Sequence, residues 1–368
     1  MILRIRRPLA VFVAFKLLLS LFIFDDANAE FVTPAHFGDA TVSPDTLSSE
    51  EAFQLGRRLF YDPILSGSNL VSCASCHIQR LAFTDGVAKS SGSYGMALEF
   101  NSMSLANLSW GNQRFFWNGR ATSLEQQVLA ALISIEEMDQ DLEELVKELG
   151  SMADYDRRFQ KVYGELSPEA IADGLSLFMR QLVSYQSKYD KYLLGQTRLS
   201  KQEESGRQLF FTKNNSGAEN QGGGCASCHH LVPRSANSQT FDGFRNNGLD
   251  DGDNLSKGLM ETTGQEQHKG LFKTPTLRNI AVTAPYMHDG RFQTLREVVE
   301  HYSKGVKASP TLDPVLRGNA QFQSDTVQPK RLRLGDEDVE ALVAFLKTLT
   351  DENFLTNPRF SDPFASND

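Results

Sequence analysis

All four cysteines of the chain lie in two copies of one pentapeptide, Cys-Ala-Ser-Cys-His, at residues 73–77 and 225–229. Two thiols at this spacing can add across the two vinyl groups of a haem, and the histidine that follows takes the position below the iron. The sequence therefore predicts two covalently bound haem c groups. Their attachment and iron-ligating residues are Cys73, Cys76 and His77 for the first, and Cys225, Cys228 and His229 for the second.

Three other uses of Cys-x-x-Cys compete with haem attachment. A thioredoxin-like site needs one such motif in a βαβ unit, and the chain has no alternating strand pattern of useful length. A zinc site brings two motifs about 15 to 20 residues apart, whereas these are 152 residues apart. Two local disulfides would leave the paired histidines unexplained. Haem attachment is the interpretation that accounts for all six residues.

An internal repeat predicts that the two haems differ on the distal side, which is the side of the iron away from the histidine of each motif. Gly56-Arg57-Arg58-Leu59-Phe60 returns as Gly206-Arg207-Gln208-Leu209-Phe210, and Asn118-Gly119-Arg120 returns as Asp289-Gly290-Arg291. The second match is a shift of 171 residues along the chain. The same shift aligns Tyr302 with Ala131, which cannot bind iron. If this position faces the distal side of each haem, the first iron is open and the second is capped by Tyr302. Met287 is a competing ligand, and a tyrosine that only packs in the core is the other alternative.

An open ferric haem needs a group that moves a proton between the two oxygens of peroxide. Glu137 and Gln127 lie on or just after the helix expected to carry Ala131, so Glu137 is the candidate proton carrier and Gln127 a candidate for orienting peroxide. Trp117, one of two tryptophans, is a candidate relay for electrons between the haems. The alternatives are a solvated surface charge for a glutamate and core packing for the tryptophan.

These residues must be positioned by a mostly α fold, for which we expect two tandem duplicated cytochrome c-like haem domains with long loops. The predicted domains are 30–199 for the N-terminal haem and 200–350 for the C-terminal haem, followed by a tail at 351–368. Helices are expected over 141–149 and 336–349. Four capping motifs mark further helix starts: Ser48-x-x-Glu51, Ser123-x-x-Gln126, Ser200-x-x-Glu203 and Thr294-x-x-Glu297.

Residues 1–29 have the features of a cleaved export signal. A basic start is followed by an apolar run over 9–24 and by the small-x-small pattern Ala27-Asn28-Ala29. A membrane anchor is the alternative, but the run is short for a bilayer span and Lys16 interrupts it. We therefore expect a periplasmic protein without stable membrane insertion.

The length and the net charge of the chain exclude further classes of protein. The 368 residues are enough for two domains of ordinary size, and four cysteines are too few for a disulfide scaffold. The formal charge is −9, and because residues 1–29 carry a net +2, the remainder carries −11. Such an acidic protein repels phosphate backbones, so nucleic-acid binding is not expected.

With these residues in hand, the chain resembles the bacterial dihaem cytochrome c peroxidases and their relative, the MauG protein of methylamine utilisation. The resemblance covers about residues 48–349. It is carried by the cysteine motifs and by several ordered runs: Leu59-Phe60-Tyr61-Asp62, Phe115-Phe116-Trp117-Asn118-Gly119-Arg120, Glu137-Met138, Lys273-Thr274-Pro275-Thr276-Leu277-Arg278-Asn279 and Thr283-Ala284-Pro285-Tyr286-Met287-His288-Asp289-Gly290.

The resemblance implies that the N-terminal haem is peroxidatic and that the C-terminal haem relays electrons. It implies that Glu137, Gln127 and Trp117 are the distal acid/base, the distal glutamine and the inter-haem tryptophan. It also implies a calcium ion held by Asn101, Thr283 and Pro285, whose oxygen ligands suit Ca²⁺.

Two departures from many of these peroxidases bring the chain closer to MauG. No distal histidine stands between His77 and His229, and tyrosine replaces methionine at position 302. In the same region, Ala130, Ala131 and Ile135 replace glycine and proline residues that are common in the family.

The expected activity is reduction of hydrogen peroxide to water with electrons from a small cytochrome c or cupredoxin. The first alternative is a MauG-type oxidase that modifies side chains of a partner protein. The second is an electron carrier with both irons six-coordinate. The resemblance also implies a possible homodimer.

Overall fold

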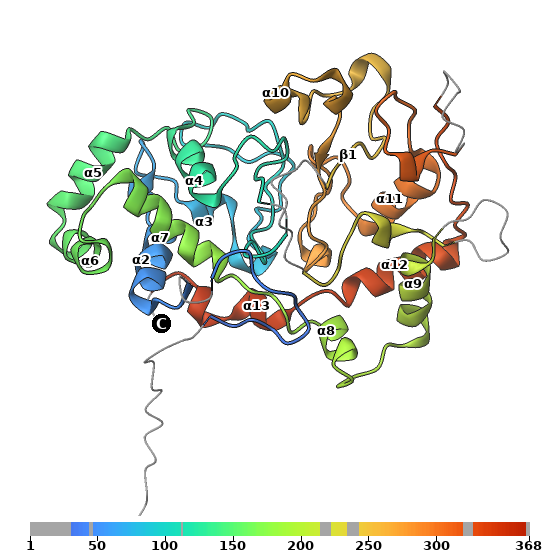
Figure 1. The fold of residues 1–368 in the computed structure, drawn as a ribbon, viewed down its shortest axis with the longest axis horizontal. Helices are drawn as coiled ribbons and strands as arrows, with labels where there is room; N and C mark the ends of the chain where they lie inside the picture. Colours follow the sequence, from blue (N-terminus) through green and yellow to red (C-terminus); the bar gives the residue numbers. More distant parts are fainter. Residues whose placement is uncertain are drawn as a thin grey trace, which may run out of the picture.

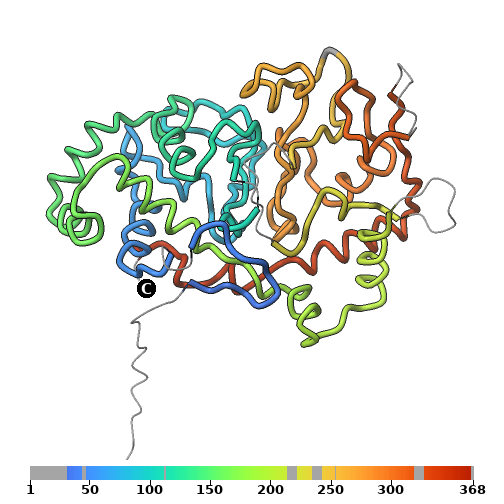
Figure 2. The backbone as a smooth tube through the Cα atoms, viewed as in Figure 1, coloured from blue at the N-terminus to red at the C-terminus, as the bar shows by residue number. Residues whose placement is uncertain are grey.

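The computed structural model describes residues 31–43, 47–111, 113–213, 222–233, 243–318 and 327–365. The predicted export signal lies outside these ranges. The described chain is mostly helical, which confirms the mostly α character of the predicted fold class. Figure 1 shows two lobes side by side: helices α2 to α7 gather in one, and α9 to α12 in the other. Between the lobes the path runs through long irregular segments, as the tube in Figure 2 shows.

The helices of the first lobe are α2 (Glu50–Tyr61), α3 (Cys73–Cys76), α4 (Leu124–Ile133), α5 (Leu142–Ser151), α6 (Ala153–Tyr163) and α7 (Pro168–Arg180). The later helices of the chain are α8 (Lys188–Leu193), α9 (Lys201–Phe211), α10 (Met260–Thr263), α11 (Leu295–Glu300), α12 (Asp336–Lys347) and α13 (Glu352–Thr356). The strands β1 (Phe244–Arg245) and β2 (Phe272–Lys273) form a two-residue antiparallel pair.

A close helix pair forms the centre of each lobe, and a glycine permits each approach. A Cβ added at Gly56 in α2 would lie 1.9 Å from the carbonyl oxygen of Gly174 in α7. A Cβ added at Gly206 in α9 would lie 1.9 Å from the carbonyl oxygen of Ala341 in α12. These are the glycines of the repeated Gly-Arg-x-Leu-Phe run. The same requirement for backbone approach therefore explains the glycine in both copies.

Three of the four predicted helix starts agree with the structure, and one is displaced. The hydroxyls of Ser123, Ser200 and Thr294 accept the expected backbone N–H groups at the starts of α4, α9 and α11. The predicted cap at Ser48 is wrong by one residue, because Ser49 caps α2 and accepts the N–H of Ala52. Adjacent serines offer the same hydroxyl, so the tertiary position of the helix decides which one caps it.

The two asparagines of the repeated Leu-x-Asn segment meet at one serine between the lobes. Asn107 donates from Nδ2 to the carbonyl of Ser184 and accepts the N–H of that residue, at 3.0 and 2.8 Å. Asn279 donates from Nδ2 to the hydroxyl of Ser184 at 3.0 Å and accepts the N–H of Asp351 at 2.8 Å. Both asparagines have positive φ. These bonds fix the lobes, and with them the haem motifs, relative to each other.

The segment after α12, expected as a tail, crosses to the first lobe. Phe354 of α13 and Phe360 are buried in the core that contains α2 and α7. Arg57 of α2 donates from Nε to the carbonyl of Ser361 at 2.6 Å, and the hydroxyl of Tyr61 donates to the carbonyl of Phe360 at 2.7 Å. The C-terminal end therefore stabilises the N-terminal haem lobe (Figure 1). In the described ranges, no helix combines the length and apolar character that a membrane crossing requires.

Candidate functional site

Each Cys-Ala-Ser-Cys-His segment forms a short helical turn that ends at the histidine. In both turns the histidine N–H donates to the carbonyl of the first cysteine at 3.0 Å. The first turn is α3, and the second is a 3₁₀ turn over Cys225–Ser227. The two thiols and the imidazole of each motif line a common cavity, of about 430 Å³ in the first lobe and about 500 Å³ in the second. Both volumes fall in the range of cofactor sites.

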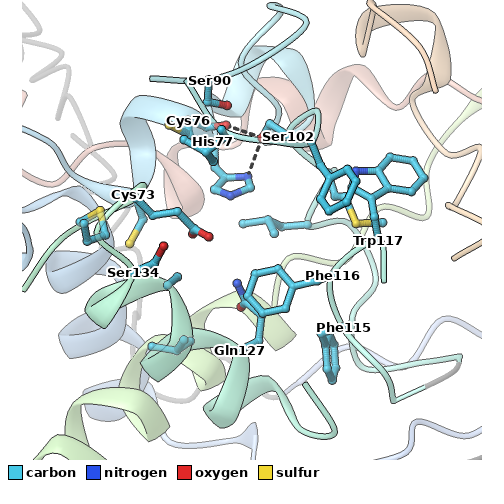
Figure 3. Close-up of a pocket in the computed structure, with 18 of the residues that line it drawn as sticks. Cys73, Cys76, His77, Ser90, Ser102, Phe115, Phe116, Trp117, Gln127 and Ser134 are labelled. Carbon is cyan, nitrogen blue, oxygen red and sulfur yellow. Dashed lines mark hydrogen bonds between the residues drawn. The ribbon is translucent and has the colours of Figure 1, made fainter. Parts of the chain in front are cut away.

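The two histidines are held in the way that iron ligation requires. Nδ1 of His77 lies 2.7 Å from the carbonyl oxygen of Phe83, and Nδ1 of His229 lies 3.3 Å from that of Pro275. A carbonyl only accepts, so Nδ1 carries the hydrogen and Nε2 keeps its lone pair for a metal. Burial lowers the pKa of both rings, to about 4 for His229, and so keeps them neutral. Ser102 also lies beside the ring of His77 (Figure 3).

The cysteines have the character of attachment residues. All four are free thiols in the structure. Burial raises the pKa of Cys73 and of Cys225 to about 12. A redox-active Cys-x-x-Cys site requires a lowered thiol pKa. The environment therefore fits covalent haem attachment better than a thioredoxin-like site, and these residues fit the haem c cofactors that the sequence predicts.

The predicted distal residues come together across the first cavity from His77. Gln127 and Ala131 lie one helical turn apart on α4, and Glu137 lies in the turn that follows it; all three line the cavity. In Figure 3 the side chain of Gln127 points from α4 toward the space below the His77 ring. Among the described residues that line this cavity, His77 supplies the only imidazole.

The carboxylate of Glu137 is partly withdrawn from solvent and faces one cation. Burial raises the pKa of Glu137, while the nearby charge of Arg120 opposes that rise. The two side chains lie 3.4 Å apart, from Nη2 to Oε1. Arg120 in turn stacks on Phe116, with its guanidinium carbon 3.3 Å from the ring centroid. A carboxyl group that has a raised pKa and lies next to the guanidinium of Arg120 is suited to accept and return a proton.

Trp117 lies between the two haem cavities and lines both. Its ring is buried, and Nε1 donates to the carbonyl of Asn101 at 2.8 Å. Lys273 of β2 also lines both cavities; its ammonium group donates to the carbonyl of Arg114 and lies 4.8 Å from the centroid of the Phe115 ring. The backbone N–H of Lys273 donates to the carbonyl of Trp117 at 2.9 Å. This hydrogen bond joins the lobes at the position predicted for the relay.

The second cavity contains both candidate ligands for its iron. Tyr302 lies in a π-helical turn, His301–Gly305, that continues α11 and lines the cavity. Burial raises the pKa of its phenol to about 12. Met287 lines the same cavity, and its sulfur accepts a hydrogen bond from Nδ2 of Asn247 at 3.4 Å.

The predicted calcium ligands Asn101, Thr283 and Pro285 line a third cavity, which lies between the lobes. Nδ2 of Asn101 donates to the carbonyl of Val87 at 2.8 Å, so Oδ1 is the amide atom suited to a cation. Within the described ranges, no group of three His, Cys, Asp or Glu side chains forms a metal cluster. Amide and carbonyl oxygens are consistent with a hard cation such as Ca²⁺.

Sequence reasoning missed three residues that the structure brings to the cavities: Arg120, Lys273 and Asn247. Arg120 and Lys273 belong to runs that had been recognised as motifs, but their positions beside Glu137 and Trp117 depend on the packing of distant segments. Asn247 lies in the long loop that follows residue 240, where no local pattern marks it.

Comparison with known proteins places the chain among haem enzymes. Residues 50–198 and 200–353 match a family described as di-haem cytochrome c peroxidase. The chain is 32% identical over 306 residues to the methylamine utilization protein MauG of Methylorubrum extorquens, covering 82% of this chain and 79% of that protein. It is 33% identical over 309 residues to the cytochrome c551 peroxidase of Nitrosomonas europaea, covering 83% and 81%.

Solved structures agree with this relationship. A crystal structure of a MauG-like protein associated with microbial copper homeostasis is 35% identical and has a TM-score of 0.79, with coverage of 90% of this chain and 99% of that one. The diheme peroxidase BthA from Burkholderia thailandensis, at 24% identity and a TM-score of 0.67, covers 85% and 90% and shares the fold. The chain therefore belongs to the di-haem cytochrome c peroxidase family.

Proposed function

We propose that the protein is an exported, periplasmic peroxidase that reduces hydrogen peroxide to two waters with two electrons and two protons. The observation that carries this proposal is the difference between the cavities. Each cavity is lined by a Cys-Ala-Ser-Cys-His turn. Ala131 also lines the first cavity, whereas Tyr302 lines the second. Alanine leaves room for peroxide, whereas tyrosine offers an oxygen ligand. The first haem is thus the reactive one, and the second is the relay.

The haem, when bound by Cys73, Cys76 and His77, supplies the redox chemistry that cleaves the O–O bond. Glu137 would accept a proton from one oxygen of peroxide and return it to the other, which departs as water. The raised pKa of Glu137 supports this return, because the carboxyl group holds a proton at a higher pH than an exposed glutamate would. Gln127 orients the peroxide through a hydrogen bond from its side chain, which α4 carries on the side of the cavity away from His77.

Electrons reach the first site from a redox partner through the second haem and Trp117. The buried position of Trp117 between the cavities supports this route. Lys273 places a positive charge at the same boundary, which favours the arrival of negative charge. A small cytochrome c or cupredoxin is the partner we propose. A calcium ion at Asn101, Thr283 and Pro285 would hold the lobes and Trp117 in place, and a homodimer is the proposed assembly.

Mixing the fully ferric protein with peroxide in a stopped-flow cell tests the central claim. We expect an immediate change in the haem spectrum without prior reduction, followed by oxidation of an added reduced small cytochrome c. The Tyr302→Phe variant should alter the resting spectrum of the second haem only. A ferric protein that stays inert until one haem is reduced would contradict the proposal.

A MauG-type oxidase that modifies side chains of a partner protein is the second candidate. Tyr302 favours it, because a phenolate ligand stabilises high oxidation states of iron and MauG carries tyrosine at this position. The two candidates differ in the source of electrons. Turnover with a reduced carrier supports the peroxidase, while peroxide-dependent oxidation of a co-purifying protein without any carrier supports the oxidase.

A further inference from the structure

Asn247 lines the second cavity together with both candidate ligands of its iron, Met287 and Tyr302. Its Nδ2 donates to the sulfur of Met287 at 3.4 Å. An amide nitrogen carries two hydrogens, so one is given to Met287 and a second is available for the oxygen of Tyr302.

The backbone of Asn247 is tied to the turn that carries Tyr302. Nε2 of His301 lies 3.1 Å from the carbonyl oxygen of Asn247, and because a carbonyl only accepts, Nε2 is the donor. His301 is the first residue of the π-helical turn, directly before Tyr302. This hydrogen bond links the backbone of Asn247 to the turn that carries Tyr302.

The residues on either side hold Asn247 in place. The side chain of Asn246 is buried and donates to the hydroxyls of Ser309 and Thr311 at 3.0 and 2.9 Å. Gly248 has a φ of +68°, and a Cβ there would lie 2.5 Å from Cγ1 of Val306. Because the residues before and after it are held in place, Asn247 can set the positions of the side chains that it contacts.

We propose that Asn247 is a positioning residue that selects Tyr302 over Met287 as the distal ligand of the second haem. The N–H···S hydrogen bond occupies the thioether and holds Met287 in its present rotamer. The second hydrogen of the amide, given to the oxygen of Tyr302, would stabilise that oxygen as a ligand and keep the potential of the haem low. This inference rests on the part of the proposed function in which Tyr302 ligates the second iron.

The test is the ligation state of the second iron in purified ferric holoprotein, measured by electron paramagnetic resonance and by the red charge-transfer band of a sulfur–iron bond. Asn247→Leu keeps the shape and removes both hydrogens. We expect tyrosinate ligation to be replaced by thioether ligation in most molecules and the midpoint potential of this haem to rise. The double variant with Met287→Leu should lose the new band.

Further variants make the test decisive. Asn247→Asp, nearly isosteric and without the donor, should act in the same direction if the leucine variant binds too little haem. Asn353→Leu, an exposed asparagine that contacts Gln186 away from both cavities, is the matched control and should leave the spectrum unchanged.

Three results would overturn the inference. One is an unchanged second-haem ligand and potential in both Asn247 variants. Another is a resting spectrum that is insensitive to Tyr302→Phe, and the third is a resting spectrum that changes in Met287→Leu alone. Peroxide turnover of the wild-type protein, measured separately, reports on the proposed function and does not enter these outcomes.

Discussion

The two haem cavities share the same Cys-Ala-Ser-Cys-His turn but differ in the helix that carries the aligned residues Ala131 and Tyr302. In the first lobe, Ser123 starts a regular helix, α4, which runs for ten residues and carries Gln127 and Ala131. In the second lobe, the matching Thr294 starts α11, which gives way after six residues to the π-helical turn His301–Gly305. Wide turns of this kind are frequent at functional sites. In the function we propose, one change of residue and of helix type separates the reaction site from the relay site.

Ala131→Tyr should abolish that difference and have the largest effect. The phenol would fill the space opposite His77 and offer the first iron an oxygen ligand, as we propose for Tyr302 in the second cavity. We expect peroxide-dependent turnover to fall to the background rate and the high-spin ferric signal to disappear. Ala131→Phe adds similar bulk without the oxygen and should keep the high-spin signal. Persistence of both turnover and the high-spin signal in Ala131→Tyr would refute the proposed asymmetry.

Glu137→Gln should remove the proton carrier while leaving the cavity intact. We expect kcat/KM for peroxide to fall by about 10²- to 10⁴-fold, with cyanide binding retained. Glu137 must be ionised to accept the first proton. Because burial raises its pKa, the rate of wild-type protein should decline on the acid side at a higher pH than an exposed glutamate would cause. This acid limb should vanish in the variant.

The neighbouring Glu136 supplies the matched control for that measurement. It is exposed, and it also lines the mouth of the first cavity. Glu136→Gln removes the same charge from nearly the same place and should change kcat/KM by no more than about twofold. Equal losses in the two variants would indicate a general electrostatic effect and not proton transfer by Glu137.

Gly56→Ala and Gly206→Ala should destabilise the two lobes in the same way, because each adds a methyl group at 1.9 Å from a carbonyl of the partner helix. We expect a loss of about 1–3 kcal/mol of unfolding free energy in each, measured by denaturant titration of holoprotein. Gly150→Ala in α5 is the control, since its Cβ would meet Leu166 at an ordinary 3.5 Å. It should be neutral or stabilising by up to about 1 kcal/mol. A tolerated Gly206→Ala would show that the helix pairs are not equivalent.

Trp117→Phe should have the smallest effect, confined to communication between the cavities. The variant keeps an aromatic ring but loses the indole and its hydrogen bond to Asn101. We expect steady-state oxidation of a reduced cytochrome to slow by about tenfold, equivalent to about 1.4 kcal/mol in the barrier. The first reaction of ferric protein with peroxide should keep its wild-type rate. A normal steady-state rate would mean that electrons take another route.

The haem attachment sites were predictable because their chemistry is local. Two thiols and an imidazole within five residues are brought to one side by a single turn, so spacing alone indicates the site. The glycines, the cap residues and the helical fold class also follow from short patterns, although Ser48 shows that a pattern can miss by one residue. The pairing of Tyr302 with Ala131 came from the internal repeat, and both residues do line their cavities.

The rest of the site depends on contacts between segments far apart in the chain. Arg120 lies beside Glu137 because the loop before α4 folds back over the end of that helix. Lys273 meets Trp117 from a strand 156 residues later. Asn247 reaches Met287 from an irregular loop. Such contacts result from the packing of the whole chain, which brings side chains together without leaving a periodic or spaced signal. The sequence by itself therefore determined the two Cys-Ala-Ser-Cys-His motifs that line the cavities, and only the tertiary structure decided which other residues surround each motif.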